Sequence, residues 1–182
     1  MTAAEAVRVV GGFDPAKDGL AIKSLDLTLE LLTHTSAPFS RRQFMPGHIT
    51  CTALVMHPVE AQVLFMHHHR LKRWLLPGGH VEKSDASLSA AASREAAEET
   101  LVRVDPDCRP RLAGIDVHGI PPKKDEPFHL HHDLIWCFRA ATAEIATTDE
   151  APSVLWAGEK DWDRLNVADS IRNAIRRIAG AA

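Results

Sequence analysis

The sequence is poor in cysteine, in net charge and in long apolar stretches. Its three cysteines, Cys51, Cys108 and Cys137, are odd in number and far apart, which favours reduced thiols over a disulfide framework or a zinc ribbon. The net charge is only -3 at pH 7, so neither a nucleic acid polymer nor an anionic membrane surface is expected as a partner. The first residues lack the apolar core of a signal peptide, and no run has membrane-spanning length. We therefore expect a cytoplasmic protein.

The composition is that of an ordinary globular protein. Hydrophobic residues make up 45% and charged residues 25% of the 182 positions, which is enough to build a substantial core. Neither an internal repeat nor a low-complexity linker interrupts the chain. We therefore expect a single domain over residues 1–182, in which residues 1–45 form an N-terminal helical extension.

The hydrophobic pattern predicts alternating strands and helices. Leucines at helical spacing predict an amphipathic helix over residues 17–34, although every second residue from 25 to 31 is leucine, which also permits a strand. Strands are predicted over residues 48–57, 61–68, 74–79, 111–120, 129–140 and 153–158, and further helices over 86–101 and 170–182. This order predicts an α/β (α+β) fold in which a mixed sheet is covered by helices on both faces.

The segment PGGHVEKSDASLSAAASREAAEETLV, residues 77–102, concentrates negative charge on one side of a predicted helix. Glu95, Glu98 and Glu99 lie at i, i+3 and i+4, so their side chains point the same way. Like charges at this spacing are unfavourable, and more so when they are partly buried, unless a cation compensates them. Carboxylate oxygens are hard ligands that suit Mg²⁺ or Mn²⁺. The alternative from spacing alone is a solvated helix rich in alanine and glutamate.

The same segment resembles the Nudix box, G-x5-E-x7-R-E-U-x-E-E-x-G-U, in which U is a bulky aliphatic residue. Residues 94–99, REAAEE, match its R-E-U-x-E-E core, and Gly79 matches the leading glycine, which places the box at about residues 79–102. The resemblance implies that Glu95, Glu98 and Glu99 bind divalent metal together with the carbonyl of Gly79. It also implies that Arg94 orients the carboxylates by ion pairing.

The box departs from its pattern at both ends of the helix. Asp85 stands in place of the early glutamate, and eight residues instead of seven separate it from Arg94, so the extra residue must be absorbed at the helix entrance. Leu101 occupies the final glycine position, where a left-handed C-cap is usual. Because leucine is unfavourable in that conformation, we expect the helix to continue toward Asp105 and Pro106.

The resemblance extends over roughly residues 43–180. The segments GHITCTALVM, LFMHHHRLKRWLLPGGHVE, IDVHGIP and EPFHLHHD, with the ending VLWAGEKDWDRLNVADSIRNAIRRI, are similar to a bacterial subgroup of the Nudix family. The resemblance implies the Nudix fold, in which a mixed curved sheet is sandwiched between helices and the box forms a loop–helix–loop.

Histidine and aspartate side chains form a second group of candidates. Alternation places His129, His131 and Asp133 on one face of their strand, and Asp116 and His118 share a face of the preceding strand. If the two strands pair as a hairpin, these groups converge. They would then form a second metal site or a phosphate-binding wall beside the box, or alternatively a solvent-facing polar surface.

Basic residues just before the glycine turn are candidates for contact with substrate phosphates. His69, Arg70 and Arg73 belong to this group, although a solvated basic turn would have the same composition. A further acidic residue could serve as base or ligand. Its candidates are Asp125 and Glu126 in a loop and Asp133 on a strand.

These features together predict a hydrolase that depends on Mg²⁺ or Mn²⁺. Its substrate would be a small-molecule diphosphate of the nucleoside-diphosphate type, cleaved by attack of water on phosphorus, with Glu98, Glu95 and Arg94 as the catalytic group. The alternatives are a non-catalytic Nudix-fold nucleotide or ligand sensor and a diphosphate isomerase, which would need a reactive cysteine. A homodimer is possible, as in many relatives.

Overall fold

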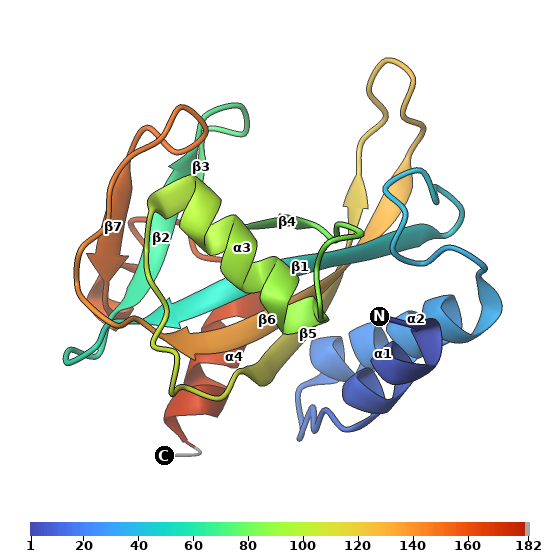
Figure 1. Ribbon diagram of the computed structural model, residues 1–182, viewed down its shortest axis with the longest axis horizontal. Coiled ribbons are helices and arrows are strands. Elements are labelled where there is room, and N and C mark those ends of the chain that lie inside the picture. Colours follow the sequence, from blue (N-terminus) through green and yellow to red (C-terminus); the bar gives the residue numbers. More distant parts are fainter. Residues whose placement is uncertain (181–182) are drawn as a thin grey trace.

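A curved sheet forms the centre of the computed structural model, which describes residues 1–180 (Figure 1). Over these residues the sheet has seven strands: β1 Gly47–Met56, β2 Val63–His68, β3 Arg73–Leu75, β4 Gly78–His80, β5 Arg111–Ile120, β6 His129–Arg139 and β7 Val154–Ala157. The strand order is β3-β2-β1-β6-β5, with β4 paired to β1 and β7 paired to β2. Strands β1 and β6 are parallel, and the other pairs are antiparallel.

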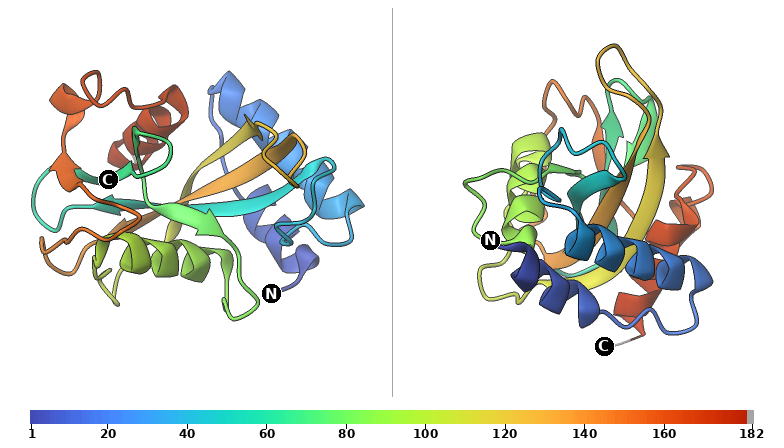
Figure 2. Two further views of the ribbon diagram at one scale, coloured as in Figure 1. Left: turned by 90° about the horizontal axis from the view of Figure 1, so that it is seen from above. Right: turned by 90° about the vertical axis from the view of Figure 1, so that its right-hand side faces the viewer.

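Helices cover both faces of the sheet, as predicted. The described helices are α1 Ala3–Gly11, α2 Gly19–His34, α3 Leu88–Thr100 and α4 Asp169–Ala179, with a short 3-10 turn at Glu159–Asp161. Helix α3 lies across one face and α4 on the other, as the view from above in Figure 2 shows. Helices α1 and α2 pack into the same hydrophobic cluster as α3. None of the helices within residues 1–180 combines the length and the apolar character that a membrane-crossing helix requires.

Strand alternation divides the core into two hydrophobic clusters. Ile49 and Leu134 belong to the cluster under α3, whereas Leu54 and Ile135 belong to the cluster under α4. Successive side chains of a strand point to opposite faces, so neighbouring residues such as Leu134 and Ile135 enter different clusters. The sheet is therefore buried by apolar side chains from both sides.

Strand β1 organises the sheet because it has three partners. It runs parallel to β6 over ten residue pairs from Gly47↔Leu130 to Met56↔Arg139. On its other edge it meets β2 only at Met56↔Val63, so β1 and β2 diverge. The short strand β4 pairs with β1 over residues 50–52. This arrangement places the glycine turn beside the centre of the sheet.

The predicted elements are largely found, with one strand divided. Residues 19–34 form a helix and not a strand, with Thr28, Leu31 and Leu32 buried on one side of it. The predicted strand 74–79 is wrong: β3 ends at Leu75 and β4 begins at Gly78, because proline lacks the N–H that a continuous strand would need at position 77. The predicted helix 170–182 is present as far as Ala179, and residues 181–182 lie outside the described part.

The predicted continuation of α3 past Leu101 is also wrong. The helix ends at Thr100, and Leu101 takes the left-handed conformation itself, with φ 55° and ψ 13°. Its N–H still donates to the carbonyl of Ala97 at 3.0 Å. The side chain of Val102 is only 2% exposed, so the chain must turn sharply at position 101 to bury it. The free energy gained by burying the Val102 side chain exceeds the cost of a left-handed leucine, which is roughly 1–2 kcal/mol.

Replacing Leu101 by glycine should therefore stabilise the protein. Leu101 is 58% exposed, so its side chain contributes little packing, whereas glycine adopts a positive φ without steric cost. We expect Leu101→Gly to raise the free energy of unfolding by about 1 kcal/mol, measured by chemical denaturation. Leu101→Ala is the matched control, since it removes the side chain but keeps the Cβ. An equal gain in both variants would contradict a backbone origin.

Candidate active site

The predicted box begins in β4 and runs through α3, and the segment between these two elements is closed by local hydrogen bonds. The Ser87 hydroxyl caps α3 by accepting the N–H of Ala90 at 3.0 Å. Asp85 accepts the N–H of Glu82 at 2.8 Å. Helix α3 begins at Leu88 and continues to Thr100, so the spacing from Arg94 to Glu99 is helical.

The Arg94 guanidinium joins the two ends of this segment. It donates to both carboxylate oxygens of Asp85, at 2.9 and 3.0 Å, in a bidentate pair. It also donates to the backbone carbonyl of His80 at 3.0 Å. Two further bonds reach Glu95 at 2.9 Å and Glu98 at 3.0 Å. These bonds lower the pKa of the Asp85 carboxyl and raise the pKa of Arg94, so both groups remain charged.

The three glutamates of α3 share one edge but differ in burial. We call Glu95, Glu98 and Glu99 the carboxylate edge. The Glu98 side chain is 59% exposed, whereas Glu99 is only 6% exposed and accepts the N–H of Gly78 at 2.9 Å. Burial raises the pKa of Glu95, and it raises the pKa of Glu99 to about 8.

Gly79 lies directly against the carboxylate edge. A Cβ at this position would come within 2.7 Å of the Glu95 carboxyl carbon. A side chain at position 79 would displace the Glu95 carboxylate, so glycine allows the backbone to approach Glu95 this closely. The turn and the helix together bring a main-chain segment and the carboxylate edge into one place.

The carboxylate edge has the properties of a site for a hard divalent cation. Among the described residues, Arg94 is the one cationic side chain bonded to it, and that guanidinium also neutralises Asp85. Burial is the main cause of the raised pKa values of Glu95 and Glu99, so their charged forms are disfavoured unless a cation binds. All side-chain donors of the edge are carboxylate oxygens, which suit Mg²⁺ or Mn²⁺. The residues present fit such an ion.

The predicted hairpin is present, and its polar residues lie on the face of the sheet opposite α3. Strands β5 and β6 pair antiparallel, with Asp116 opposite Asp133 and His118 opposite His131. His118 and Asp116 are bonded at 2.9 Å, which raises the pKa of His118. The Asp133 carboxylate accepts the Thr50 hydroxyl at 2.9 Å, and burial raises its pKa.

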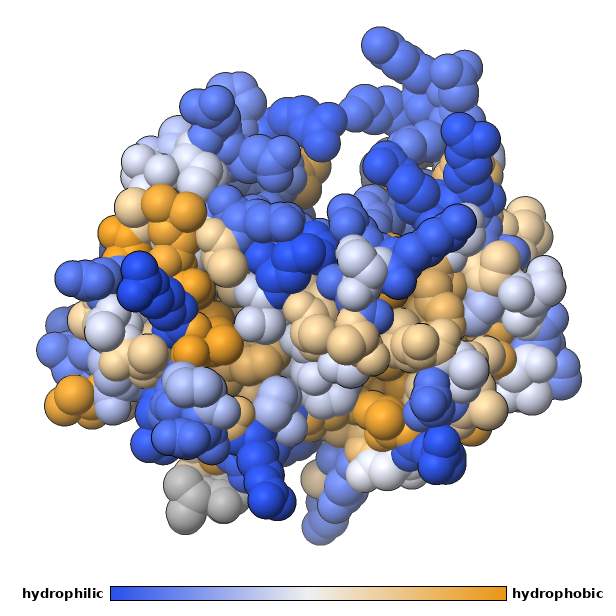
Figure 3. Space-filling view, in the orientation of Figure 1, coloured by the Kyte–Doolittle hydropathy of each residue, from blue (hydrophilic) through white to orange (hydrophobic). Residues whose placement is uncertain are grey.

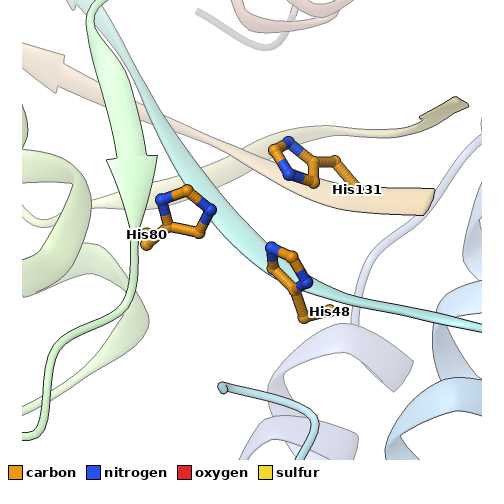
Figure 4. A group of neighbouring side chains, drawn as sticks. All are labelled: His48, His80 and His131. Atoms are coloured by element: carbon orange, nitrogen blue, oxygen red, sulfur yellow. The ribbon is translucent and has the colours of Figure 1, made fainter. Parts of the chain in front are cut away.

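Two histidines that sequence reasoning missed join this group. His48 on β1 and His80 on β4 lie beside His131, with ring centroids 4.8–5.4 Å apart across the three pairs. The rings of His48 and His129 are stacked, and His129 is only 3% exposed. Figure 4 shows that the side chains of His48, His80 and His131 point toward one another from three strands. The parallel pairing of β1 with β6 carries no local signal, so the sequence did not indicate it.

The remaining candidates lie on surface turns. His69 and Arg70 are exposed in the turn between β2 and β3, and Arg73 is exposed at the first position of β3. Glu126 lies in the loop after β5, 3.6 Å from Arg41. Figure 3 shows the surface hollowed between these two parts of the chain, with hydrophilic residues around the hollow. The candidates therefore flank an opening without forming a single cluster.

A further acidic residue that sequence reasoning missed is Glu150. Its carbonyl accepts the N–H of His69 at 3.1 Å, and Thr148 in the same loop donates to the carbonyl of Glu99 at 2.8 Å. The charge of Glu150 contributes to the raised pKa values of Glu95 and Glu99. An exposed glutamate in a loop carries no distinctive sequence signal.

Comparison with known proteins identifies the family. The sequence model of the NUDIX domain matches residues 48–177, so the chain belongs to the Nudix family. Family and fold are therefore as the sequence predicted, and they support a Nudix hydrolase, which cleaves pyrophosphate linkages. No curated protein is significantly similar in sequence.

Solved structures share this fold at low sequence identity. The NUDIX domain of Shewanella oneidensis NrtR, complexed with ADP ribose, has a TM-score of 0.55 at 19% identity, covering 84% of this chain and 96% of that chain. A MutT protein from Methanosarcina mazei has a TM-score of 0.50 at 22% identity, covering 73% and 93%. A C. elegans Ap4A hydrolase binary complex has a TM-score of 0.50 at 13% identity, covering 72% and 95%.

Replacing Arg94 by lysine should lower the free energy of unfolding of the whole protein. Lysine cannot make the bidentate pair with Asp85 while also reaching the His80 carbonyl, so partly buried acceptors lose their donors. We expect a loss of about 2 kcal/mol in the free energy of unfolding, measured by chemical denaturation. Arg164→Lys, on an exposed pair with Asp161, is the control and should change stability by less than about 0.5 kcal/mol. Equal effects would exclude a special role for Arg94.

Proposed function

We propose that the protein hydrolyses a diphosphate linkage in a nucleoside-diphosphate-type substrate at the carboxylate edge, using Mg²⁺ or Mn²⁺. One observation supports this most: the side chains of Glu95 and Glu99 are largely buried, and within residues 1–180 Arg94 is the one cationic side chain bonded to the edge. Such an arrangement is costly unless a cation binds. A solvated surface helix would leave all three carboxylates in water.

Glu95, Glu98 and Glu99 would hold the ion, together with the carbonyl of Gly79. The bound ion would neutralise the diphosphate oxygens and make a water molecule more acidic. Magnesium usually keeps several water and phosphate ligands, so an open edge suits it better than a closed cage. Arg94 acts as a positioning residue, because it holds Glu95 and Glu98 against Asp85 and the turn.

The reaction needs a base and a phosphate-binding surface. The water oxygen forms a bond to phosphorus, the bridging P–O bond breaks, and the water proton passes to a carboxylate. Glu98 is the accessible member of the carboxylate edge and is the proposed base, and the charge of Glu150, outside α3, acts on Glu95 and Glu99. The products are two phosphate-terminated fragments.

Substrate contacts are proposed on both sides of the opening. His69, Arg70 and Arg73 are exposed on one side and can donate to phosphate oxygens. Glu126 lies on the other side, and the exposed His118 and the partly buried His131 lie on the polar face. His129 is hydrogen-bonded to the carbonyl of Pro127, and the Asp133 carboxylate accepts the hydroxyl of Thr50. We therefore propose that these two residues position the polar face and do not contact the substrate themselves.

The alternative functions receive less support. A diphosphate isomerase would need a reactive cysteine, but Cys51 is fully buried and burial raises the pKa values of Cys51 and Cys137. A non-catalytic sensor would not need the complete carboxylate edge. The NrtR domain complexed with ADP ribose and the Ap4A hydrolase suggest which diphosphates to test first.

Replacing Glu98 by glutamine should abolish hydrolysis while leaving the fold intact. The side chain is exposed, so an amide of the same shape is tolerated, but it can no longer carry charge or accept a proton. We expect a loss of about 100-fold or more in kcat against ADP-ribose, diadenosine polyphosphates or nucleoside triphosphates in Mg²⁺. The measurement is phosphate or nucleotide release with product identification.

The matched control is Glu60→Gln, which changes an exposed glutamate of the β1–β2 turn. It should retain full activity. Full activity in Glu98→Gln would contradict the proposed site. A wild-type protein that binds these diphosphates without cleaving any of them would favour the sensor.

A further inference from the structure

Three imidazole rings converge on the face of the sheet opposite the carboxylate edge. His48, His80 and His131 offer one ring nitrogen each, and these atoms all lie within 4.8 Å of one another. We call them the three-histidine cluster. The residues come from β1, β4 and β6, and the pairing of these strands brings them together: His48 is opposite His131, and His80 is opposite Thr50. The cluster is therefore built where three paired strands meet, near the first residues of β1 and β6 (Figure 4).

His48 is oriented as a ligand would be. Its Nδ1 lies 3.2 Å from the backbone carbonyl of Gln43, which can only accept, so Nδ1 carries the proton. Its Nε2 therefore has a free lone pair. This atom is buried and has no hydrogen-bond partner among the described residues, and the whole residue is 1% exposed. A second ring nitrogen donating to a carbonyl is the arrangement that usually orients a metal-binding histidine.

The cluster contains a polar atom without a partner: Nε2 of His48 is buried and has no hydrogen-bond partner among the described residues. An imidazole nitrogen with a free lone pair is the form that binds metal. An unpartnered nitrogen in a buried place is otherwise unfavourable, because a polar atom loses its water there.

We propose that the three-histidine cluster is a site for a divalent transition metal of the zinc class, separate from the magnesium site at the carboxylate edge. Imidazole nitrogen suits zinc, cobalt or nickel and does not suit magnesium. Three protein ligands leave a fourth position open, as in many zinc sites. With Zn–N bonds of about 2.0–2.1 Å, the nitrogens would move to about 3.4 Å apart, which small side-chain rotations achieve.

Strand β4 connects this cluster to the proposed site of hydrolysis. Gly79 faces Glu95 on one side of the strand, and His80 faces His48 and His131 on the other. The carbonyl of His80 also accepts a bond from Arg94. An ion in the cluster would therefore fasten β4 to β1 and β6 and hold the turn that carries Gly79. Its presence does not depend on the proposed hydrolysis.

Cobalt binding tests the proposal on the full chain carrying no polyhistidine tag. After treatment with a chelator, the wild-type protein should bind one Co²⁺ per chain, with the visible absorption of a four-coordinate cobalt centre and a raised Tm. Excess Mg²⁺ should leave the spectrum unchanged. His131→Gln and, independently, His80→Asn should each weaken binding by about 100-fold or more.

Two controls separate this site from others. His69→Ala alters the exposed histidine run before β3 and should leave the cobalt spectrum unchanged. Glu98→Gln should also retain it, even though it abolishes hydrolysis, so failure of either proposal is distinguishable. Absence of bound cobalt in the wild type, unchanged binding in both cluster variants, or loss of the spectrum in His69→Ala would each overturn the proposal.

Discussion

The candidate site depends on one guanidinium held among carboxylates. Arg94 bonds to Asp85, Glu95, Glu98 and the carbonyl of His80, and so ties the entrance of α3 to its middle and to β4. One positive charge cannot neutralise this many acids. The helix is therefore held in a defined shape while part of its negative charge remains available, which is the condition that a cation-dependent site requires.

Strand β4 separates two chemically different environments. Its glycine backbone approaches the carboxylates of α3 on one side, and its histidine joins two other rings on the opposite side. Hard oxygen donors select magnesium or manganese, whereas imidazole nitrogens select zinc-class ions. A strand of only three residues can serve both because β1, which pairs with it, is itself fixed along its whole length by β6.

What could be predicted from sequence was local. The spacing of Glu95, Glu98 and Glu99 determines their common side of a helix, and strand alternation was enough to bring His118 beside His131. The fold followed from the resemblance of the box and its flanking segments. That His48 and His80 join the cluster could not be predicted, because it depends on a parallel pairing of distant strands and on a strand of three residues.

The end of α3 shows how packing overrides a local preference. Leucine disfavours the left-handed conformation, so the sequence alone indicates a longer helix, but burial of Val102 imposes the turn at Leu101. Glu150 illustrates the same limit for the site, since its loop reaches the carboxylate edge only through contacts such as that of Thr148 with Glu99.

Metal occupancy at the carboxylate edge tests the central claim most directly. Crystals of the full chain soaked in Mn²⁺ should show anomalous scattering beside Glu95, Glu98 and Glu99, within bonding distance of their oxygens. Crystals that show no manganese at this edge, with the three carboxylates still in their metal-free positions, would contradict the account.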